Sequence, residues 1–133
     1  MALTADVEYY TKAGTTETLN IKGGAADTLY KGAMVNIGTD GYLKVAADVA
    51  SEFPLGVVKK QVVEDGTHLD VEVETGVIRI AHSGAAQTDV GALFYATADD
   101  TLADSASNVG AFGLCVDWES GYLWIDTRIK RLS

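Results

Sequence analysis

The stretch Leu69-Asp70-Val71-Glu72-Val73-Glu74 decides the fold class, because aliphatic and acidic side chains alternate along it. Successive side chains of a β-strand point to opposite faces of the sheet. A period of two therefore places the aliphatic groups on one face and the carboxylates on the other. The stretch predicts a strand with one buried face and one solvent face.

The rest of the chain has the composition of short antiparallel strands joined by tight turns. It contains 14 Gly and one Pro, and apolar residues at helical spacing are nearly absent. One turn, Glu119-Ser120-Gly121, is predicted as a three-residue hairpin loop that sets Trp118 opposite Tyr122, with Trp124 on the same face as Tyr122. We therefore predict an all-β fold, a small antiparallel barrel or sandwich with little or no helix.

An internal repeat organises the chain. A shift of 59 positions without a gap aligns identical residues, and it predicts two pseudo-repeated halves at about 16–58 and 75–117. Chance similarity between turn sequences is the alternative explanation. The repeat also predicts that Gly32 and Gly91 occupy equivalent bends. The matched pairs are Gly32/Gly91, Ala33/Ala92, Asp40/Asp99, Leu43/Leu102, Ala47/Ala106, Phe53/Phe112, Leu55/Leu114 and Val57/Val116.

Length and charge narrow the function classes. The chain has 133 residues, enough for one domain, and its net charge of -9 disfavours nucleic-acid binding, which needs a basic surface. No apolar run is long enough to span a membrane, so we expect the protein to be cytosolic when made. The single cysteine, Cys115, lies in an apolar run and is predicted to be a buried thiol.

Residues able to carry catalysis or bind a metal are few. His68 and His82 show no spacing typical of a triad or a metal pair, and we interpret them as exposed or turn-capping. Asp99, Asp100 and Asp104 lack the glycine and terminal Glu of a calcium loop, which favours a solvated turn. We expect no catalytic residues, no cofactor and no metal. The basic tail is interpreted as a solvated end or a guard of the last strand edge, with an acidic partner as the alternative; it comprises Arg128, Lys130 and Arg131.

The chain resembles the phage capsid decoration (cement) proteins over nearly its whole length. The likeness is diffuse, since it consists mainly of turn and Gly-Ala positions. It is carried by Ala2–Asp6, Tyr30–Val35, Gly41–Leu43, Pro54–Val58, Val73–Ile80, Asp89–Tyr95, Phe112–Val116 and Trp124–Ile125.

The resemblance implies a structural protein that binds the major capsid protein on the outside of an expanded double-stranded DNA phage head. It implies location on the virion exterior and a homo-oligomer, with a trimer favoured over a dimer. Residues 1–15 would form an extended capsid-binding arm, and residues 16–133 a single β domain. The predicted contact residues in the arm are Ala2, Leu3, Thr4, Val7, Tyr9 and Tyr10.

Two other classes of function remain open. Trp118, Tyr122 and Trp124 near one hairpin suggest a carbohydrate- or host-surface-binding module of a virion. A hydrolase that uses His68 or His82 is the weakest alternative, because neither histidine has a recognisable partner in the sequence.

Overall fold

Strand β7, Asp70–Thr75, confirms the predicted alternation in the computed structural model, which describes residues 3–132. Val71 and Val73 are fully buried, whereas the acidic residues between and beside them face outward. Leu69 precedes the strand and is exposed, so the alternating pattern begins one residue later than predicted.

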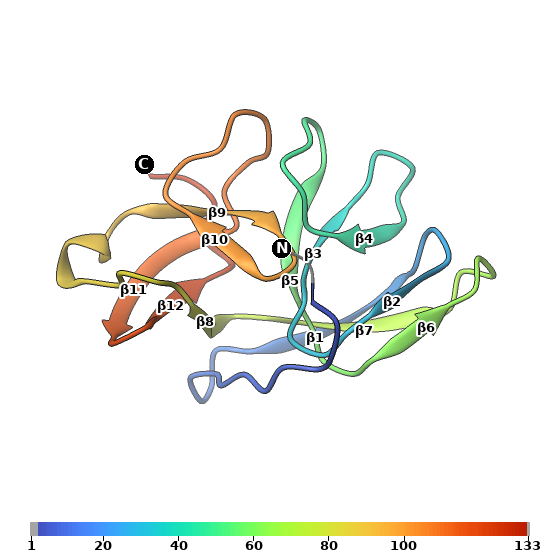
Figure 1. Ribbon diagram of the computed structural model, residues 1–133, viewed down its shortest axis with the longest axis horizontal. Helices are drawn as coiled ribbons and strands as arrows, with labels where there is room; N and C mark the ends of the chain where they lie inside the picture. Colours follow the sequence, from blue (N-terminus) through green and yellow to red (C-terminus); the bar gives the residue numbers. More distant parts are fainter. Residues whose placement is uncertain (1–2, 133) are drawn as a thin grey trace.

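The described residues form two five-stranded sheets and one two-stranded sheet, shown in Figure 1. All ladders between these strands are antiparallel, and no sheet closes into a barrel, so the sandwich alternative fits. None of the described residues belongs to a helix long and apolar enough to cross a membrane. The elements are β1 Glu17–Lys22, β2 Asp27–Leu29, β3 Met34–Ile37, β4 Leu43–Val45, β5 Phe53–Val58, β6 Val62–Glu64, β7 Asp70–Thr75, β8 Val77–Ala81, the 3-10 turn η1 Gln87–Asp89, β9 Leu93–Ala98, β10 Thr101–Ala103, β11 Gly113–Glu119 and β12 Tyr122–Asp126.

The two large sheets have the same strand order, so the chain consists of two similar halves, and each half extends beyond the predicted bounds of 16–58 and 75–117 to include β7 or β12. The first sheet runs β1-β7-β5-β3-β4, and the second, read from the corresponding edge, runs β8-β12-β11-β9-β10. Gly32 and Gly91 both have positive φ, 86° and 92°, as expected for equivalent bends. The small β2-β6 sheet is present in the first half, and η1 occupies the position of β2 in the second.

The pairing of strands corrects the predicted alignment near the end of each half. Met34 pairs with Val57, and Leu93, 59 positions after Met34, pairs with Leu114. The structural counterpart of Val57 is therefore Leu114 and not Val116. The span from Leu43 to Val57 is two residues longer than the matching span from Leu102 to Leu114, so the identical residues at Phe53, Leu55 and Val57 do not occupy equivalent structural positions.

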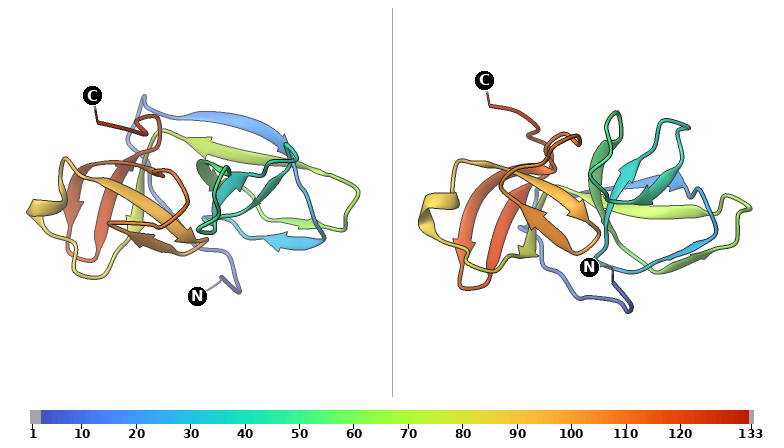
Figure 2. Two further views of the ribbon diagram at one scale, coloured as in Figure 1. Left: turned by 90° about the horizontal axis from the view of Figure 1, so that it is seen from above. Right: turned by 45° about the horizontal axis from the view of Figure 1, so that its top comes forward.

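Each half has its own apolar core, and strands β3 and β5 of the first half contribute side chains to both cores. In these strands alternate residues face different cores: Val35 and Val58 enter the first, while Met34 and Val57 enter the second. Figure 2 shows the resulting pair of lobes side by side. The first core comprises Leu29, Ala33, Val35, Leu43, Leu55, Val58, Val71 and Val73. The second core comprises Met34, Ala46, Val57, Ile78, Ile80, Phe94, Ala96, Leu102, Phe112, Cys115, Leu123 and Ile125.

Equivalent loops of the two halves are joined at the top of Figure 1. The Asp48 carboxylate accepts main-chain hydrogen bonds from Ser107, Asn108 and Val109 at 3.1, 2.8 and 2.7 Å. These bonds lower the pKa of Asp48, because they favour its ionised form. The clamp fixes one half against the other on the side opposite the N-terminal residues.

Candidate functional site: the N-terminal segment and the aromatic face

Residues 3–12, here called the N-terminal segment, lie extended across both halves. The Leu3 N–H donates to the Asp99 carboxylate in the second half at 3.0 Å. The Val7 N–H donates to the Lys31 carbonyl in the first half at 2.9 Å. Figure 1 shows the segment running along the lower side of the molecule, so the predicted arm is docked on the domain.

Further along, the segment lies beside the edge of the second sheet. The Arg79 N–H donates to the Tyr10 carbonyl at 2.9 Å, and the Lys12 N–H donates to the Val77 carbonyl at 3.1 Å. These are the main-chain groups of β8 that face away from β12. The segment thus covers a strand edge that would otherwise be open to unprogrammed pairing.

The six predicted contact residues fall into three groups. Val7 and Tyr10 are 44% and 58% exposed, and Thr4 is also exposed, so these three can meet a partner directly. Leu3 packs against the first core and Tyr9 against the second, so both hold the segment in place. Ala2 lies outside the described residues.

Tyr9 anchors the segment through its side chain. Its hydroxyl donates to the Glu74 carboxylate on β7 at 2.7 Å. Burial first, then this bond, raises the pKa of Tyr9, so the hydroxyl remains protonated and available as a donor. Asp99 is also buried, which raises the pKa of its carboxyl, while the Leu3 N–H bond acts in the opposite direction.

A cavity of about 220 Å³ lies between the segment and the two halves. Its walls include Leu3, Val7 and Tyr9 from the segment, Met34 from the first half and Ile80 from the second. The cavity is partly apolar, and it marks a place where the segment does not fill the groove beneath it.

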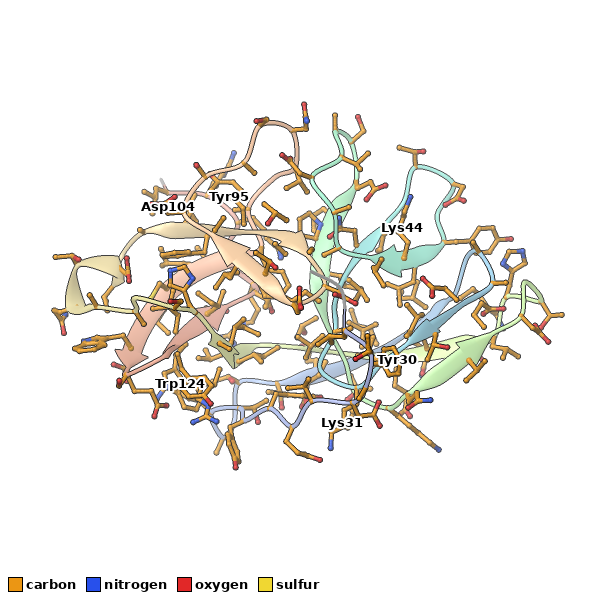
Figure 3. All side chains as sticks on the ribbon, in the orientation of Figure 1. Tyr30, Lys31, Lys44, Tyr95, Asp104 and Trp124 are labelled. Atoms are coloured by element: carbon orange, nitrogen blue, oxygen red, sulfur yellow. The ribbon has the colours of Figure 1, made fainter. Side chains whose placement is uncertain are left out.

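An aromatic face lies next to the segment on the outer side of the second sheet. Figure 3 shows both Trp124 and Lys31 on the lower side of the molecule. The Arg79 guanidinium lies 4.4 Å from the Tyr10 ring centre and 3.9 Å from that of Tyr122. The Lys12 ammonium lies 4.5 Å from the Trp124 ring centre. The aromatic face comprises Tyr10, Lys12, Arg79, Glu119, Tyr122 and Trp124.

Glu119 ties the aromatic face together. Its carboxylate accepts the Trp124 indole N–H at 3.1 Å and lies 3.5 Å from an Arg79 guanidinium nitrogen. The buried Arg79 Nε has no hydrogen-bond partner among the described residues. Stacked cations and a shared carboxylate hold these side chains in a fixed arrangement.

The predicted placement of Trp118 is wrong. Glu119, and not Trp118, lies opposite Tyr122, because the loop contains only Ser120 and Gly121. A bulge between Cys115 and Asp117 shifts the register by one residue and turns Trp118 towards the second core. The three aromatic residues therefore do not form one platform.

Both histidines bind main-chain carbonyls where each half curls round. His68 Nδ1 lies 2.7 Å from the Gly23 carbonyl, and its ring stacks on Tyr42. His82 Nδ1 lies 3.1 Å from the Leu102 carbonyl, whose counterpart, the Leu43 carbonyl, accepts the Gly24 N–H. The half-buried histidines thus join strand ends, which the sequence did not indicate.

The acidic residues Asp99 and Asp100 bind different partners. Asp99 is buried and binds the N-terminal segment, whereas Asp100 accepts the Thr101 hydroxyl at 3.0 Å. No group of three or more His, Cys, Asp or Glu within residues 3–132 is arranged to hold a metal ion.

The basic tail is bound to its own chain. Arg128 forms a bidentate pair with Asp126, both bonds at 2.8 Å, which lowers the pKa of Asp126. The Lys130 ammonium donates to the Phe112 carbonyl at 2.7 Å and faces the Phe53 ring. Arg128 and Arg131 are both exposed, as expected of a solvated end, whereas Lys130 is partly buried.

Replacing Lys130 by Met is expected to stabilise the protein by about 1–2 kcal/mol at pH 7. Burial lowers the pKa of Lys130 to about 8, so the folded wild type binds fewer protons than the unfolded chain above that pH. Stability of the wild type therefore rises between about pH 8 and pH 10, and this rise is absent in the variant. Urea unfolding at several pH values measures the difference.

Lys60→Met serves as the control for the Lys130 variant, because Lys60 is exposed. It should leave the pH dependence unchanged. A Lys130→Met protein that is less stable than the wild type at pH 7 would contradict the prediction.

Comparison with protein-family models, with curated proteins and with solved structures found no match. The structure therefore defines the chain only by its architecture. It is an all-β sandwich of two repeated halves, with an N-terminal segment docked beside an aromatic face.

Proposed function

We propose that this chain is a structural decoration protein that binds the major capsid protein on the outside of a double-stranded DNA phage head and stabilises the expanded shell. The sequence resemblance motivates the proposal. The structural observation that carries it is the docked N-terminal segment, which presents Val7 and Tyr10 to solvent beside the aromatic face.

The composition of this surface is that of a protein interface. Tyr, Trp and Arg are the residues most enriched where binding energy is concentrated, and here all three kinds lie within one face. Exposed Val7 extends the apolar surface along the segment. A partner that covered these side chains would bury aromatic area and a largely desolvated guanidinium together.

The docked segment also lowers the cost of binding. An extended arm that is free in solution loses conformational entropy when it binds, whereas residues 3–12 are already held by main-chain hydrogen bonds. Preorganisation of this kind favours attachment to a rigid, repetitive surface.

Charge and thermodynamics agree with an exterior role. A net charge of -9 gives no electrostatic attraction to packaged DNA. A protein that binds only the assembled, expanded shell stabilises that state by mass action, and no chemical step is needed. The resemblance further implies that the protein acts as a homo-oligomer, with a trimer expected.

The rival reading as a carbohydrate-binding module is weakened by the same geometry. Sugar rings stack on exposed aromatic faces, yet Lys12 lies over Trp124 and Arg79 over Tyr122. Trp118 points towards the second core. The hydrolase alternative is weakened because both histidines bind main-chain carbonyls.

Mixing the purified protein with undecorated expanded heads tests the proposal. The wild type is expected to sediment with the heads and to raise their melting temperature. Tyr10→Ala should weaken this binding at least tenfold, since it removes the exposed ring that stacks on Arg79, while the stability of the free protein falls by only about 1 kcal/mol.

Val63→Ala is the matched control for Tyr10→Ala. Val63 is 62% exposed but lies on β6, away from the aromatic face, so its replacement should leave head binding unchanged. The proposal fails if the wild type does not bind expanded heads, and the assignment of the face fails if the two variants bind equally well.

A further inference from the structure

Strand β1 has an open edge whose counterpart in the second half is occupied. In the second half, the Arg79 N–H and the Val77 carbonyl bond to residues 10 and 12 of the N-terminal segment. The repeat places Asn20 at the position of Arg79 and Thr18 at that of Val77, because Leu19 pairs with Val73 as Ile78 pairs with Ile125.

The phase of the ladder shows which groups on β1 are open. The Gly23 N–H donates to the Leu69 carbonyl, so Gly23 and every second residue before it bond to β7. The main-chain groups of Thr18 and Asn20 therefore point away from β7. Both residues are exposed, and neither has a main-chain hydrogen bond on that side within residues 3–132. Figure 2 shows β1 as the outermost strand of its lobe.

A negative charge beside this edge favours a bound strand that carries a positive charge. Glu72 lies opposite Asn20 on β7, in the place that Trp124 has opposite Arg79. The Glu72 carboxylate has no ion pair among the described residues. Lys22, on β1, pairs with Asp70 at 2.9 Å, and Lys59, whose main-chain N–H donates to the Glu72 carbonyl, uses its ammonium to bind the Thr18 hydroxyl at 3.0 Å.

We propose that the Thr18–Asn20 edge of β1 accepts an extended, basic strand of the capsid protein by main-chain pairing, as β8 accepts the chain's own N-terminal segment. This inference rests on the proposed function. A main-chain carbonyl of the bound strand would accept a hydrogen bond from the Asn20 N–H, and one of its N–H groups would donate to the Thr18 carbonyl. The strand would also place a Lys or Arg side chain beside Glu72. A second copy of this chain is a poorer fit, because each copy carries a net charge of -9 and its own segment is already docked.

Asn20→Pro tests the pairing directly. It removes the outward N–H but leaves the β1–β7 ladder intact, since proline is tolerated where the N–H of an edge strand faces solvent. We expect at least tenfold weaker binding to expanded heads, with the circular dichroism of the free protein unchanged. Asn20→Thr retains the N–H and is expected to bind like the wild type, and Glu72→Gln should weaken binding several-fold and reduce its salt dependence.

Hydrogen exchange on the wild type provides a measurement that needs no variant. The Asn20 amide should exchange rapidly in the free protein and become protected on heads. Wild-type affinity in Asn20→Pro, or an Asn20 amide that stays unprotected on heads, would overturn the inference and leave the proposed function standing. Failure of the wild type to bind heads would remove both, and loss of self-association in Asn20→Pro with normal head binding would show that the occupant is a second copy.

Discussion

A chain that lacks residues 2–10 is expected to fold, to lose about 2–4 kcal/mol of stability and to bind expanded heads at least a hundredfold more weakly. The deletion uncovers apolar surface under Leu3 and Tyr9 and removes the acceptor of the Arg79 N–H. It also removes Val7 and Tyr10, the exposed side chains of the proposed contact. Urea unfolding and sedimentation with heads measure the two effects separately.

The loss of head binding is separated from the loss of stability when binding is measured well below the melting temperature of the truncated protein. Near-ultraviolet circular dichroism should remain that of a folded domain, because both cores keep all their fully buried residues. Tyr10→Ala, which retains the main-chain bonds of the segment, should reproduce part of the binding loss with little of the stability loss. Decoration of heads by the truncated protein at wild-type occupancy would show that the segment is not the contact.

Gly113→Ala is expected to destabilise the protein by about 3 kcal/mol or more, because the new side chain would collide with main chain. A Cβ at this position would lie 2.5 Å from the Asp126 carbonyl oxygen on β12. Main chain cannot move aside as a flexible side chain can, so β11 and β12 would have to separate. Gly56→Ala should act alike, because its Cβ would meet the Glu74 carbonyl on β7.

Gly110→Ala is the matched control for both glycine variants. A Cβ there would meet nothing within 4 Å, and the residue does not have positive φ, so stability should change by about 0.5 kcal/mol or less. Thermal unfolding ranks the three variants. If the Gly113→Ala protein had the same melting temperature as the Gly110→Ala protein, the close approach of β11 and β12 would be refuted.

The sequence by itself determined the features that depend on neighbouring residues. Alternation in β7 predicted its buried face, and the repeat predicted equivalent bends at Gly32 and Gly91. The apolar run around Cys115 predicted its burial, which raises the pKa of the thiol. Each of these follows from the period of a strand or the torsion of a turn, and both are set within a few residues.

Only the tertiary structure decided which distant groups meet. The bulge after Cys115 turned Trp118 towards the second core, and two additional residues between Leu43 and Val57 displaced the end of the repeat. The sequence likewise gave no sign that residues 3–12 dock along β8 or that His82 binds the Leu102 carbonyl. A main-chain group takes part in the bonds that dock the segment along β8 and in the His82 bond, and because every residue type except proline carries the same N–H and C=O groups, these bonds leave no pattern in the sequence.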